Sequence, residues 1–423
     1  MNSLSLFPRM VYSDRRGQIY VHPRWRALAS DGGSFVLPQA RAWISLPRGS
    51  SFFFLPAHRA IGFDPDSGAP AALDSGFSAV SAFLIPGYTR LYLPAAQKTD
   101  PSVTLPLWPY AAVGYKDGRF VAAGVLVDRS RRQKPGFYRD PKSLKQGIAF
   151  FRRRFPSNRL VKHLSHCALH YQCRNAQNLF LGRWEAPLPV SPVCNSRCLG
   201  CLSFAQNDCS SSHERIRFVP DPEELAQVGL EHLKKAPSAI VSFGQGCEGE
   251  PLLQEDVVRE AILLIRRKTK RGTIHMNTNG SKPKVLLDLA RAGLDSVRVS
   301  LNSLDPRFYE AYYRPKGYGL EEVLASVETA HAAGLFVSLN YLTLPGAADQ
   351  GGEINRLVRF LKKGSVHLLQ LRNLCIDPDV FRRHMPAAAG EPQGILNMID
   401  RIRRECPRVK IGYFNPPARS AKP

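Results

Sequence analysis

The feature that most constrains the fold is an alternation of short apolar runs and amphipathic helical stretches that begins near residue 185. The expected strands are APLPVSPV (186–193), SAIVSFG (238–244), TIHMN (273–277), SVRVSLN (296–302), LFVSLNYL (335–342) and HLLQLRN (367–373). Such alternation is typical of a parallel sheet with helices packed on it. Six repeats without a reversal of strand order predict an α/β fold, a partial (β/α)6 barrel similar to a TIM barrel.

The remaining sequence suggests two further parts. Before residue 185, short β-prone runs such as GQIYVHP and SFFFLP are interrupted by Pro and Gly, and Asp117-Gly118 between two apolar runs is a hairpin signal. We therefore expect residues 1–184 to form a β-rich or α+β N-terminal domain. The barrel core is expected over residues 185–378, followed by a C-terminal helix and strand over residues 379–423.

The predicted strands carry polar residues on one face. In SVRVSLN, Arg298, Ser300 and Asn302 share one side, because side chains alternate with period two along a strand. The same pattern gives a polar face made of His275, Asn277, Asn279, Ser338, Asn340, Gln370 and Arg372. An unpaired buried polar group costs about 1–3 kcal/mol. We therefore expect this face to hold water and a polar ligand at the C-terminal strand ends; the alternative is a network that satisfies itself.

Three cysteines follow the first predicted strand, in VCNSRCLGC: Cys194, Cys198 and Cys201. Three thiolates are one too few for a closed tetrahedral zinc site. They suit an iron-sulfur cluster in which one iron lacks a protein ligand, because Cys thiolates usually hold such clusters. The alternative is a zinc site completed by Cys209 or a histidine.

Composition bears on partners and compartment. The 423-residue chain has 58 Lys+Arg against 35 Asp+Glu, a net charge of +23, which attracts polyanions. A basic segment over residues 129–162 is either a solvated face or an anion-docking surface. The sequence shows no secretory signal and no apolar run long enough to span a membrane, and nine cysteines in an unsecreted chain favour metal binding or catalysis over disulfides. We expect a cytoplasmic protein.

The cysteine motif and later motifs resemble the radical SAM enzymes, and are similar to those of molybdenum-cofactor-biosynthesis-protein-A-like members. The family signature CxxxCxxC matches Cys194, Cys198 and Cys201, and Gly249-Glu250-Pro251 resembles the family's Gly-Gly-Glu-Pro. TNG (278–280) and VSLNS (299–303) follow at later strand ends. The resemblance covers about residues 187–375, under half of the chain.

This resemblance implies a 4Fe-4S cluster held by Cys194, Cys198 and Cys201, with S-adenosylmethionine (SAM) on the fourth iron. One electron, from a donor such as ferredoxin or flavodoxin, would cleave SAM to methionine and a 5'-deoxyadenosyl radical that takes hydrogen from an unknown substrate. The implied SAM-binding residues are Gly249, Glu250, Pro251, Asn279, Ser300, Asn302, Asn340 and Arg372. The basic N-terminal half favours RNA or a phosphorylated small molecule over a peptide as substrate. Two alternatives are a glycyl-radical activating enzyme and a non-catalytic zinc and nucleic-acid-binding protein.

Two features depart from the family pattern. Gly200 stands before the last cysteine, where the family usually has an aromatic or large apolar residue, and Phe204 is the expected substitute. Cys247 lies beside the expected SAM pocket; we interpret it as a buried spectator thiol, with a reactive thiol as the alternative.

Two residue clusters have no assigned role. HLSHCALHYQC places His163, His166, Cys167 and His170 on one helical face with Cys173 beyond it, which favours a core and rim over a second metal site but leaves both open. Tyr309, Tyr312, Tyr313 and Tyr318 cluster after the fourth strand, where packing and substrate stacking are both compatible with the sequence.

Overall fold

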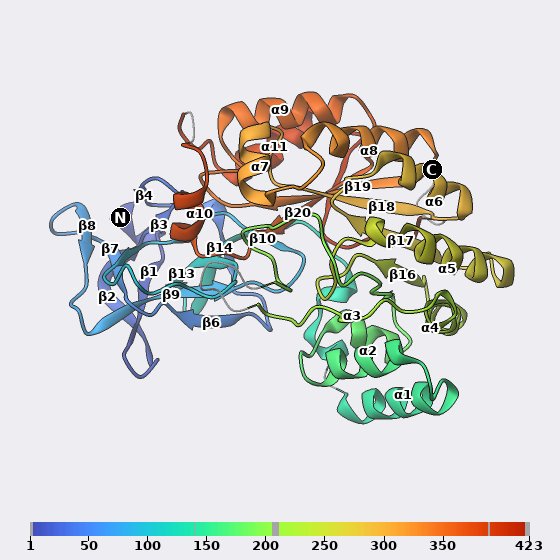
Figure 1. Ribbon diagram of the computed structural model, residues 1–423. Coiled ribbons are helices and arrows are strands. Elements are labelled where there is room, and N and C mark those ends of the chain that lie inside the picture. The colour runs from blue at the N-terminus through green and yellow to red at the C-terminus, as the bar shows by residue number, and fades with distance from the viewer. Residues whose placement is uncertain (1–2, 139, 205–210, 388–389, 419–423) are drawn as a thin grey trace.

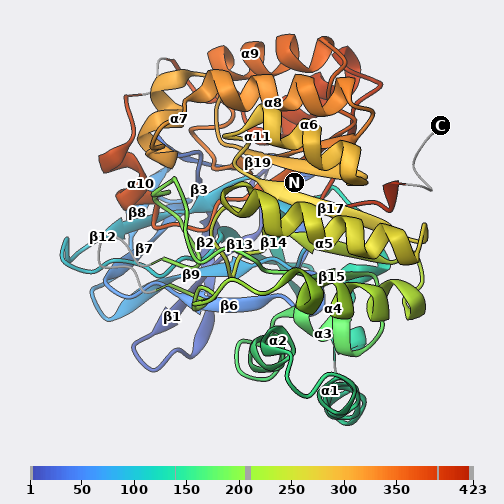
Figure 2. The same ribbon diagram turned by 45° about the vertical axis from the view of Figure 1, so that its right-hand side comes forward.

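The computed structural model describes residues 3–138, 140–204, 211–387 and 390–418. An N-terminal antiparallel β domain precedes a parallel β/α partial barrel, as the sequence predicts. Figures 1 and 2 show the β domain on one side of the barrel and helices α1–α3, residues 141–180, below its first strands. The domain boundaries drawn from the sequence stay predictions.

The N-terminal domain is built on an eleven-stranded antiparallel sheet with a small three-stranded sheet beside it. Its strands are β1 (Arg9–Asp14), β2 (Ile19–Ala27), β3 (Ala29–Ser30), β4 (Phe35–Val36), β5 (Trp43–Ser45), β6 (Ser51–Phe54), β7 (His58–Asp64), β8 (Ala69–Ala72), β9 (Phe77–Phe83), β10 (Tyr88–Arg90), β11 (Leu93–Pro94), β12 (Ala96–Lys98), β13 (Tyr110–Lys116) and β14 (Arg119–Leu126). The predicted hairpin is confirmed: Asp117 and Gly118, both with positive φ, join β13 to β14.

Three helices link the two parts: α1 (Pro141–Arg154), α2 (Arg159–Leu169) and α3 (Arg174–Phe180). In α1, Leu144, Ile148 and Phe151 are buried on one face, whereas the arginines of the last turn are exposed. The apolar face thus packs α1 onto the protein, and the basic residues remain available to solvent.

The barrel is a seven-stranded sheet in the order β15-β16-β17-β18-β19-β20-β21. The strands are β15 (Glu185–Pro187), β16 (Ile240–Phe243), β17 (Thr273–Thr278), β18 (Ser296–Leu301), β19 (Phe336–Thr343), β20 (Leu368–Asn373) and β21 (Lys410–Gly412). The helices are α4 (Pro222–Lys235), α5 (Glu255–Lys268), α6 (Pro283–Ala292), α7 (Pro306–Tyr313), α8 (Leu320–Ala332), α9 (Gly351–Lys362), α10 (Pro378–His384) and α11 (Ile395–Glu405). Every strand pair is parallel, and the C-terminal strand extends the sheet beyond the six predicted strands.

The first barrel strand is shorter than the apolar run that predicts it. The ladder of β15 ends at Pro187, and Leu188 adds one hydrogen bond to the carbonyl oxygen of Ser242 at 2.8 Å. Pro189 and Pro192 have no N–H group to continue the ladder. The chain therefore leaves the sheet early and becomes the loop that carries the three cysteines.

The N-terminal domain is joined to the barrel through a buried arginine on β10. The Arg90 side chain has no solvent exposure and donates to the carbonyl oxygen of Leu374 at 2.7 Å, while the Arg90 backbone N–H donates to Oδ1 of Asn373 at 2.8 Å. A buried guanidinium is costly unless it is hydrogen-bonded. The two parts therefore meet at the end of β20, on the rim where ligands bind in such barrels.

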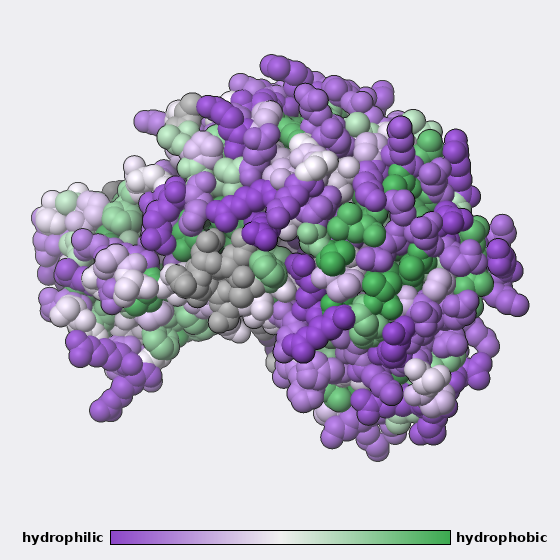
Figure 3. Space-filling model, viewed as in Figure 1, coloured by the Kyte–Doolittle hydropathy of each residue, from purple (hydrophilic) through white to green (hydrophobic). Residues whose placement is uncertain are grey.

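Most of the surface seen in Figure 3 is hydrophilic, with apolar residues gathered over the region of β16, β17 and α5. Within the described ranges, no helix combines the length and the apolar character needed to cross a membrane.

Two buried histidines make stability depend on pH. Burial lowers the pKa of His232 and of His275 to about 4, below the value of about 6.5 in an unfolded chain. As pH falls below 6.5 the unfolded state takes up protons first, so stability present above pH 6.5 is lost as pH falls toward 4. Between pH 6.5 and 5 each histidine should lower the free energy of unfolding by about 2 kcal/mol. The buried carboxyls Glu248, Glu250 and Asp349, whose pKa values are raised to about 7, act in the opposite direction, so the histidine contribution is measured by urea denaturation as the difference between the wild type and a variant.

The matched variants are His232→Gln, which should lack this contribution of about 2 kcal/mol, and His170→Gln at an exposed histidine, which should keep it. If the free energy of unfolding changed with pH equally in the wild type and in His232→Gln, the lowered pKa assigned to His232 would be contradicted.

Candidate functional site

A cavity of about 540 Å³ opens at the C-terminal ends of the barrel strands. Its volume lies within the usual range for small-molecule sites, about 300–1,000 Å³. All three motif cysteines line it, together with Gly249 and Glu250 from the loop after β16. The cysteine motif and the Gly-Glu-Pro motif, some fifty residues apart in sequence, therefore face one space.

The cysteine loop is fixed by backbone hydrogen bonds to the end of α7. Arg197 N–H donates to the carbonyl oxygen of Tyr313 at 2.9 Å, and Leu199 N–H donates to that of Tyr312 at 3.0 Å. The thiols of Cys194, Cys198 and Cys201 are close enough to interact electrostatically. The loop thus presents three sulfur ligands together, as a metal cluster requires.

The electrostatics of these thiols fit a metal site. Burial raises the pKa of Cys194 to about 11 and holds the pKa of Cys198 well above its usual value. Arg215 lies beside the loop, with Nη2 at 3.7 Å from Sγ of Cys201. Without a cation such thiols stay protonated, whereas a bound metal makes them thiolates. The donor set therefore fits an iron-sulfur cluster.

Gly249 allows the loop after β16 to lie against the cysteine loop. A Cβ atom there would lie 1.9 Å from the carbonyl oxygen of Val193 and 3.2 Å from the backbone nitrogen of Cys194. Two backbone hydrogen bonds hold the contact: Gly249 N–H to the Ser191 carbonyl oxygen at 2.7 Å and Glu250 N–H to that of Val193 at 2.8 Å. Only glycine permits this approach.

Glu250 links this loop to the end of β17. Its Oε1 accepts from the hydroxyl of Thr278 at 2.5 Å and the backbone N–H of Leu252 at 3.0 Å, and its Oε2 accepts from the backbone N–H of Asn279 at 2.8 Å. Burial raises the pKa of Glu250 to about 7. The carboxylate therefore orients the TNG segment toward the cavity.

Glu248 is a site residue that sequence reasoning missed. It is buried and accepts four backbone N–H groups, from Val190, Ser191, Gly244 and Gln245, at 2.6–3.1 Å. These bonds tie the loop after β16 to the chain leading into the cysteine loop. The presence of Glu248 in GQGCEGEP carries no signal for such a role, because two of its partners, Val190 and Ser191, are backbone groups 58 and 57 residues away in sequence.

The polar strand face divides into two tiers. In the deeper tier the polar groups satisfy one another: Glu185 accepts from Ser242 and Asn415, Asn415 accepts from Gln370, and Gln370 accepts from Arg298 and Arg372. His275 likewise bonds to Ser296 and Asn277. Much of the network weighed from the sequence therefore exists and forms the floor of the cavity, although the buried hydroxyl of Ser338 has no partner among the described residues.

The upper tier faces the cavity itself. Arg298, Ser300, Asn340 and Arg372 line it, and Asn340 Nδ2 lies 3.4 Å from the hydroxyl oxygen of Ser300 on the neighbouring strand. The buried Nε atoms of Arg298 and Arg372 have no hydrogen-bond partner in the part of the chain that the structure describes. Such donors favour a polar or anionic ligand.

Of the residues predicted to bind SAM, six line the cavity with the cysteines: Gly249, Glu250, Asn279, Ser300, Asn340 and Arg372. Pro251 instead begins a short 3-10 helix, and Asn302 lies at a separate cavity, where its Nδ2 donates to the carbonyl oxygen of Phe308 at 3.1 Å. Direct SAM contacts stay predictions for all eight. Cys209, the alternative fourth zinc ligand, lies outside the described residues.

The departure at Gly200 has a structural reason. A Cβ atom there would lie 3.0 Å from the hydroxyl oxygen of Tyr312 and 3.0 Å from the carbonyl oxygen of Cys375. Tyr312 is buried on α7 and lines the cavity, so an aromatic ring from α7 lies where a residue at position 200 would otherwise project. Phe204, the substitute expected from the sequence, is 46% exposed and lies under the Arg215 guanidinium.

The four tyrosines of the cluster divide into two that line the cavity and two that do not. Tyr312 and Tyr313 line the cavity, whereas Tyr309 is fully buried and packs on Tyr313 with ring centroids 4.7 Å apart. The hydroxyl oxygen of Tyr318 lies 2.6 Å from that of Ser196, which is part of the cysteine loop. Tyr309 therefore supports the site by packing and Tyr318 by a hydrogen bond to the cysteine loop.

Comparisons with known proteins agree with the site. Residues 188–361 match the radical SAM superfamily. The chain is 30% identical over 178 residues to GTP 3',8-cyclase of Caulobacter vibrioides, covering 40% of this chain and 46% of that protein. It is 36% identical over 190 residues to the probable GTP 3',8-cyclase of Thermococcus kodakarensis, covering 44% of this chain and 55% of that protein. The superfamily match thus covers the barrel residues 188–361, and the chain spans about half the length of these relatives.

The radical SAM match over residues 188–361 implies a 4Fe-4S cluster and SAM as cofactors. Among solved structures, the hydrogenase maturase HydG of Carboxydothermus hydrogenoformans is similar with a TM-score of 0.40 at 15% identity, covering 63% of this chain and 70% of that one. This likeness is weak, and the fold described above follows from the strand order.

Proposed function

We propose that the chain is a radical SAM enzyme that cleaves SAM reductively at a 4Fe-4S cluster. One electron from the cluster, supplied by a donor such as ferredoxin or flavodoxin, yields methionine and a 5'-deoxyadenosyl radical that abstracts hydrogen from the substrate. The observation that carries the proposal is the meeting of three thiols from one loop with the Gly249-Glu250 segment at a single cavity. Such chemistry needs reduced thiols, which supports a cytoplasmic location.

The residues of the chain have distinct proposed roles. Cys194, Cys198 and Cys201 hold the cluster, and the loop at Gly249 and Glu250 binds the methionine part of SAM. The remaining proposed SAM contacts in the cavity are Asn279, Ser300, Asn340 and Arg372. For Pro251 and Asn302, which lie outside the cavity lining, we propose a role in shaping the adjoining loops.

The charge of the cavity supports an anionic substrate. Its lining arginines are Arg132, Arg174, Arg215, Arg298 and Arg372. Its glutamates, Glu185, Glu248 and Glu250, already accept hydrogen bonds from protein donors. A surplus of cations in a concave site concentrates anions. Because the cavity has small-molecule size, we propose a phosphorylated small molecule rather than RNA, and GTP, named for the relatives, is the first compound to test.

The proposal is tested with protein purified without oxygen. Addition of dithionite and SAM should give 5'-deoxyadenosine, measured by chromatography, and an anionic substrate should accelerate its formation. A colourless, zinc-loaded protein that forms no 5'-deoxyadenosine after reconstitution with iron and sulfide would overturn the proposal in favour of the non-catalytic alternative. No observation on the described residues favours the glycyl-radical activating alternative.

A further inference from the structure

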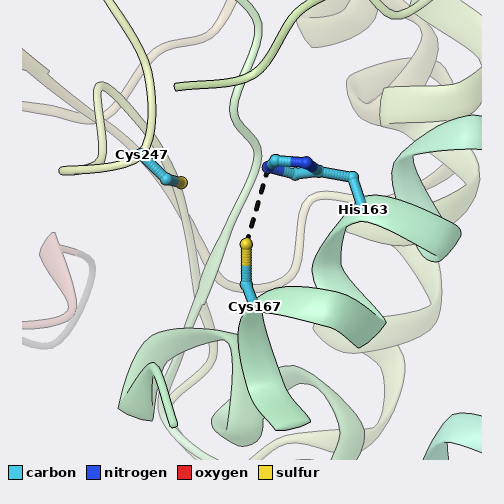
Figure 4. A group of neighbouring side chains, drawn as sticks. All are labelled: His163, Cys167 and Cys247. Carbon is cyan, nitrogen blue, oxygen red and sulfur yellow. Dashed lines mark hydrogen bonds between the residues drawn. The ribbon is translucent and has the colours of Figure 1, made fainter. Parts of the chain in front are cut away.

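A second group of metal-ligating side chains lies outside the site described above. His163 and Cys167 are one turn apart on α2, and Cys247 lies in the loop between β16 and the Gly249-Glu250 segment. Their ligand atoms all lie within 4.8 Å of one another, and Nε2 of His163 is 3.6 Å from Sγ of Cys167. Figure 4 shows the three side chains pointing toward a common centre.

We propose that His163, Cys167 and Cys247 bind a zinc ion. In a tetrahedral site with Zn–S of about 2.3 Å and Zn–N of about 2.1 Å, the S···N separation is about 3.6 Å. The distance between Cys167 and His163 equals this value. This pair on α2 is thus already spaced as zinc ligands, and Sγ of Cys247 lies within 4.8 Å of both atoms.

The chemistry of the donors selects this class of metal. Two thiols and an imidazole suit zinc, whereas magnesium and calcium prefer oxygen ligands. Cys167 and Cys247 are 1% and 5% exposed, which protects a thiolate-bound metal from exchange with solvent.

A further donor is near the group. Cys173, just beyond α2, interacts electrostatically with both Cys167 and Cys247, which makes it a candidate for the fourth ligand. The other histidines of the HLSHCALHYQC segment are directed elsewhere: His166 and His170 are exposed and stack on each other, with ring centroids 4.3 Å apart. Helical spacing alone therefore does not define the ligand set.

The position of the group suggests its purpose. Cys247 is two residues before Gly249, and its carbonyl oxygen accepts from the backbone N–H of Ile216 at 2.8 Å. A zinc ion here would join α2 to the loop that packs on the cysteine motif. We therefore assign it a structural role, fixing that loop against the helical layer. The assignment does not depend on the proposed SAM chemistry.

The test measures metal in the full-length protein. After incubation with ZnCl2 and removal of unbound metal, the Cys194→Ala/Cys198→Ala/Cys201→Ala variant, which lacks the cluster ligands, should retain about one zinc per chain by mass spectrometry. Adding Cys167→Ser or Cys247→Ser to this variant should remove that zinc. Cys406→Ser, at a buried cysteine elsewhere, is the matched control and should keep it.

X-ray absorption of the zinc-loaded triple variant provides a readout that does not depend on whether the further variants fold. It should show sulfur at about 2.3 Å together with nitrogen at about 2.0–2.1 Å. An all-oxygen shell, a zinc content below about 0.2 per chain in the triple variant, or retention of zinc by both Cys167→Ser and Cys247→Ser would overturn the proposal. So would a disulfide between Cys167 and Cys247 in freshly isolated native protein.

Discussion

Replacing Cys198 with alanine is expected to abolish the formation of 5'-deoxyadenosine, by about 1000-fold or more. Cys198 is the middle ligand of the loop, in electrostatic contact with the thiols on both sides, and its removal leaves two ligands for a cluster that needs three from this loop. The measurement is 5'-deoxyadenosine formed per chain under reducing, oxygen-free conditions, together with the iron content and visible absorbance of the reconstituted protein.

The matched control is Cys406→Ala, which removes an equally small buried thiol at the C-terminal end of α11. It should retain iron and activity, since Cys406 does not line the cavity. Full iron content in Cys198→Ala would show that the cluster is held elsewhere.

A single methyl group at Gly249 is expected to have the second largest effect. Gly249→Ala places Cβ 1.9 Å from the Val193 carbonyl oxygen, so the two loops must separate beside Cys194. We expect a loss of about 2–4 kcal/mol in the free energy of unfolding, in the range of overpacking and lost backbone hydrogen bonds, and at least about a 10-fold loss of 5'-deoxyadenosine formation.

Gly246→Ala, in the same loop, is the control. The nearest atom to a Cβ at Gly246 is Cδ1 of Leu202 at 3.9 Å, an ordinary contact. Urea denaturation and the 5'-deoxyadenosine assay should both give values near the wild type for Gly246→Ala. Similar losses of stability and activity in the two variants would indicate that the loop is sensitive to any substitution. That result would contradict the role assigned to the contact between Gly249 and Val193.

The barrel could be predicted from the sequence because its signals are local. Apolar runs of strand length, amphipathic stretches between them and alternating polar residues in SVRVSLN reflect geometry that each segment adopts by itself. The hairpin at Asp117-Gly118 is predictable for the same reason, since a two-residue turn with positive φ favours this pair. The cysteine spacing is likewise contained in one short loop.

The features that escaped prediction depend on contacts between distant segments. Cys247 meets Cys167 only because α2 packs beside the loop after β16, and no periodicity in either segment encodes that meeting. The four backbone donors around Glu248 come from two separate segments. The division of the strand face into a satisfied floor and an open upper tier depends on Asn415, contributed from beyond the last strand.

The buried Arg90 has a consequence for protein engineering. It fastens the N-terminal domain to the residues that immediately follow Arg372, a lining residue of the cavity. The barrel is thus not an interchangeable module: a chimera that transplants it onto another N-terminal domain has to carry β10 as well, or the wall bearing Arg372 loses its anchor. Evolution of a new specificity in this architecture is correspondingly expected to alter both parts together.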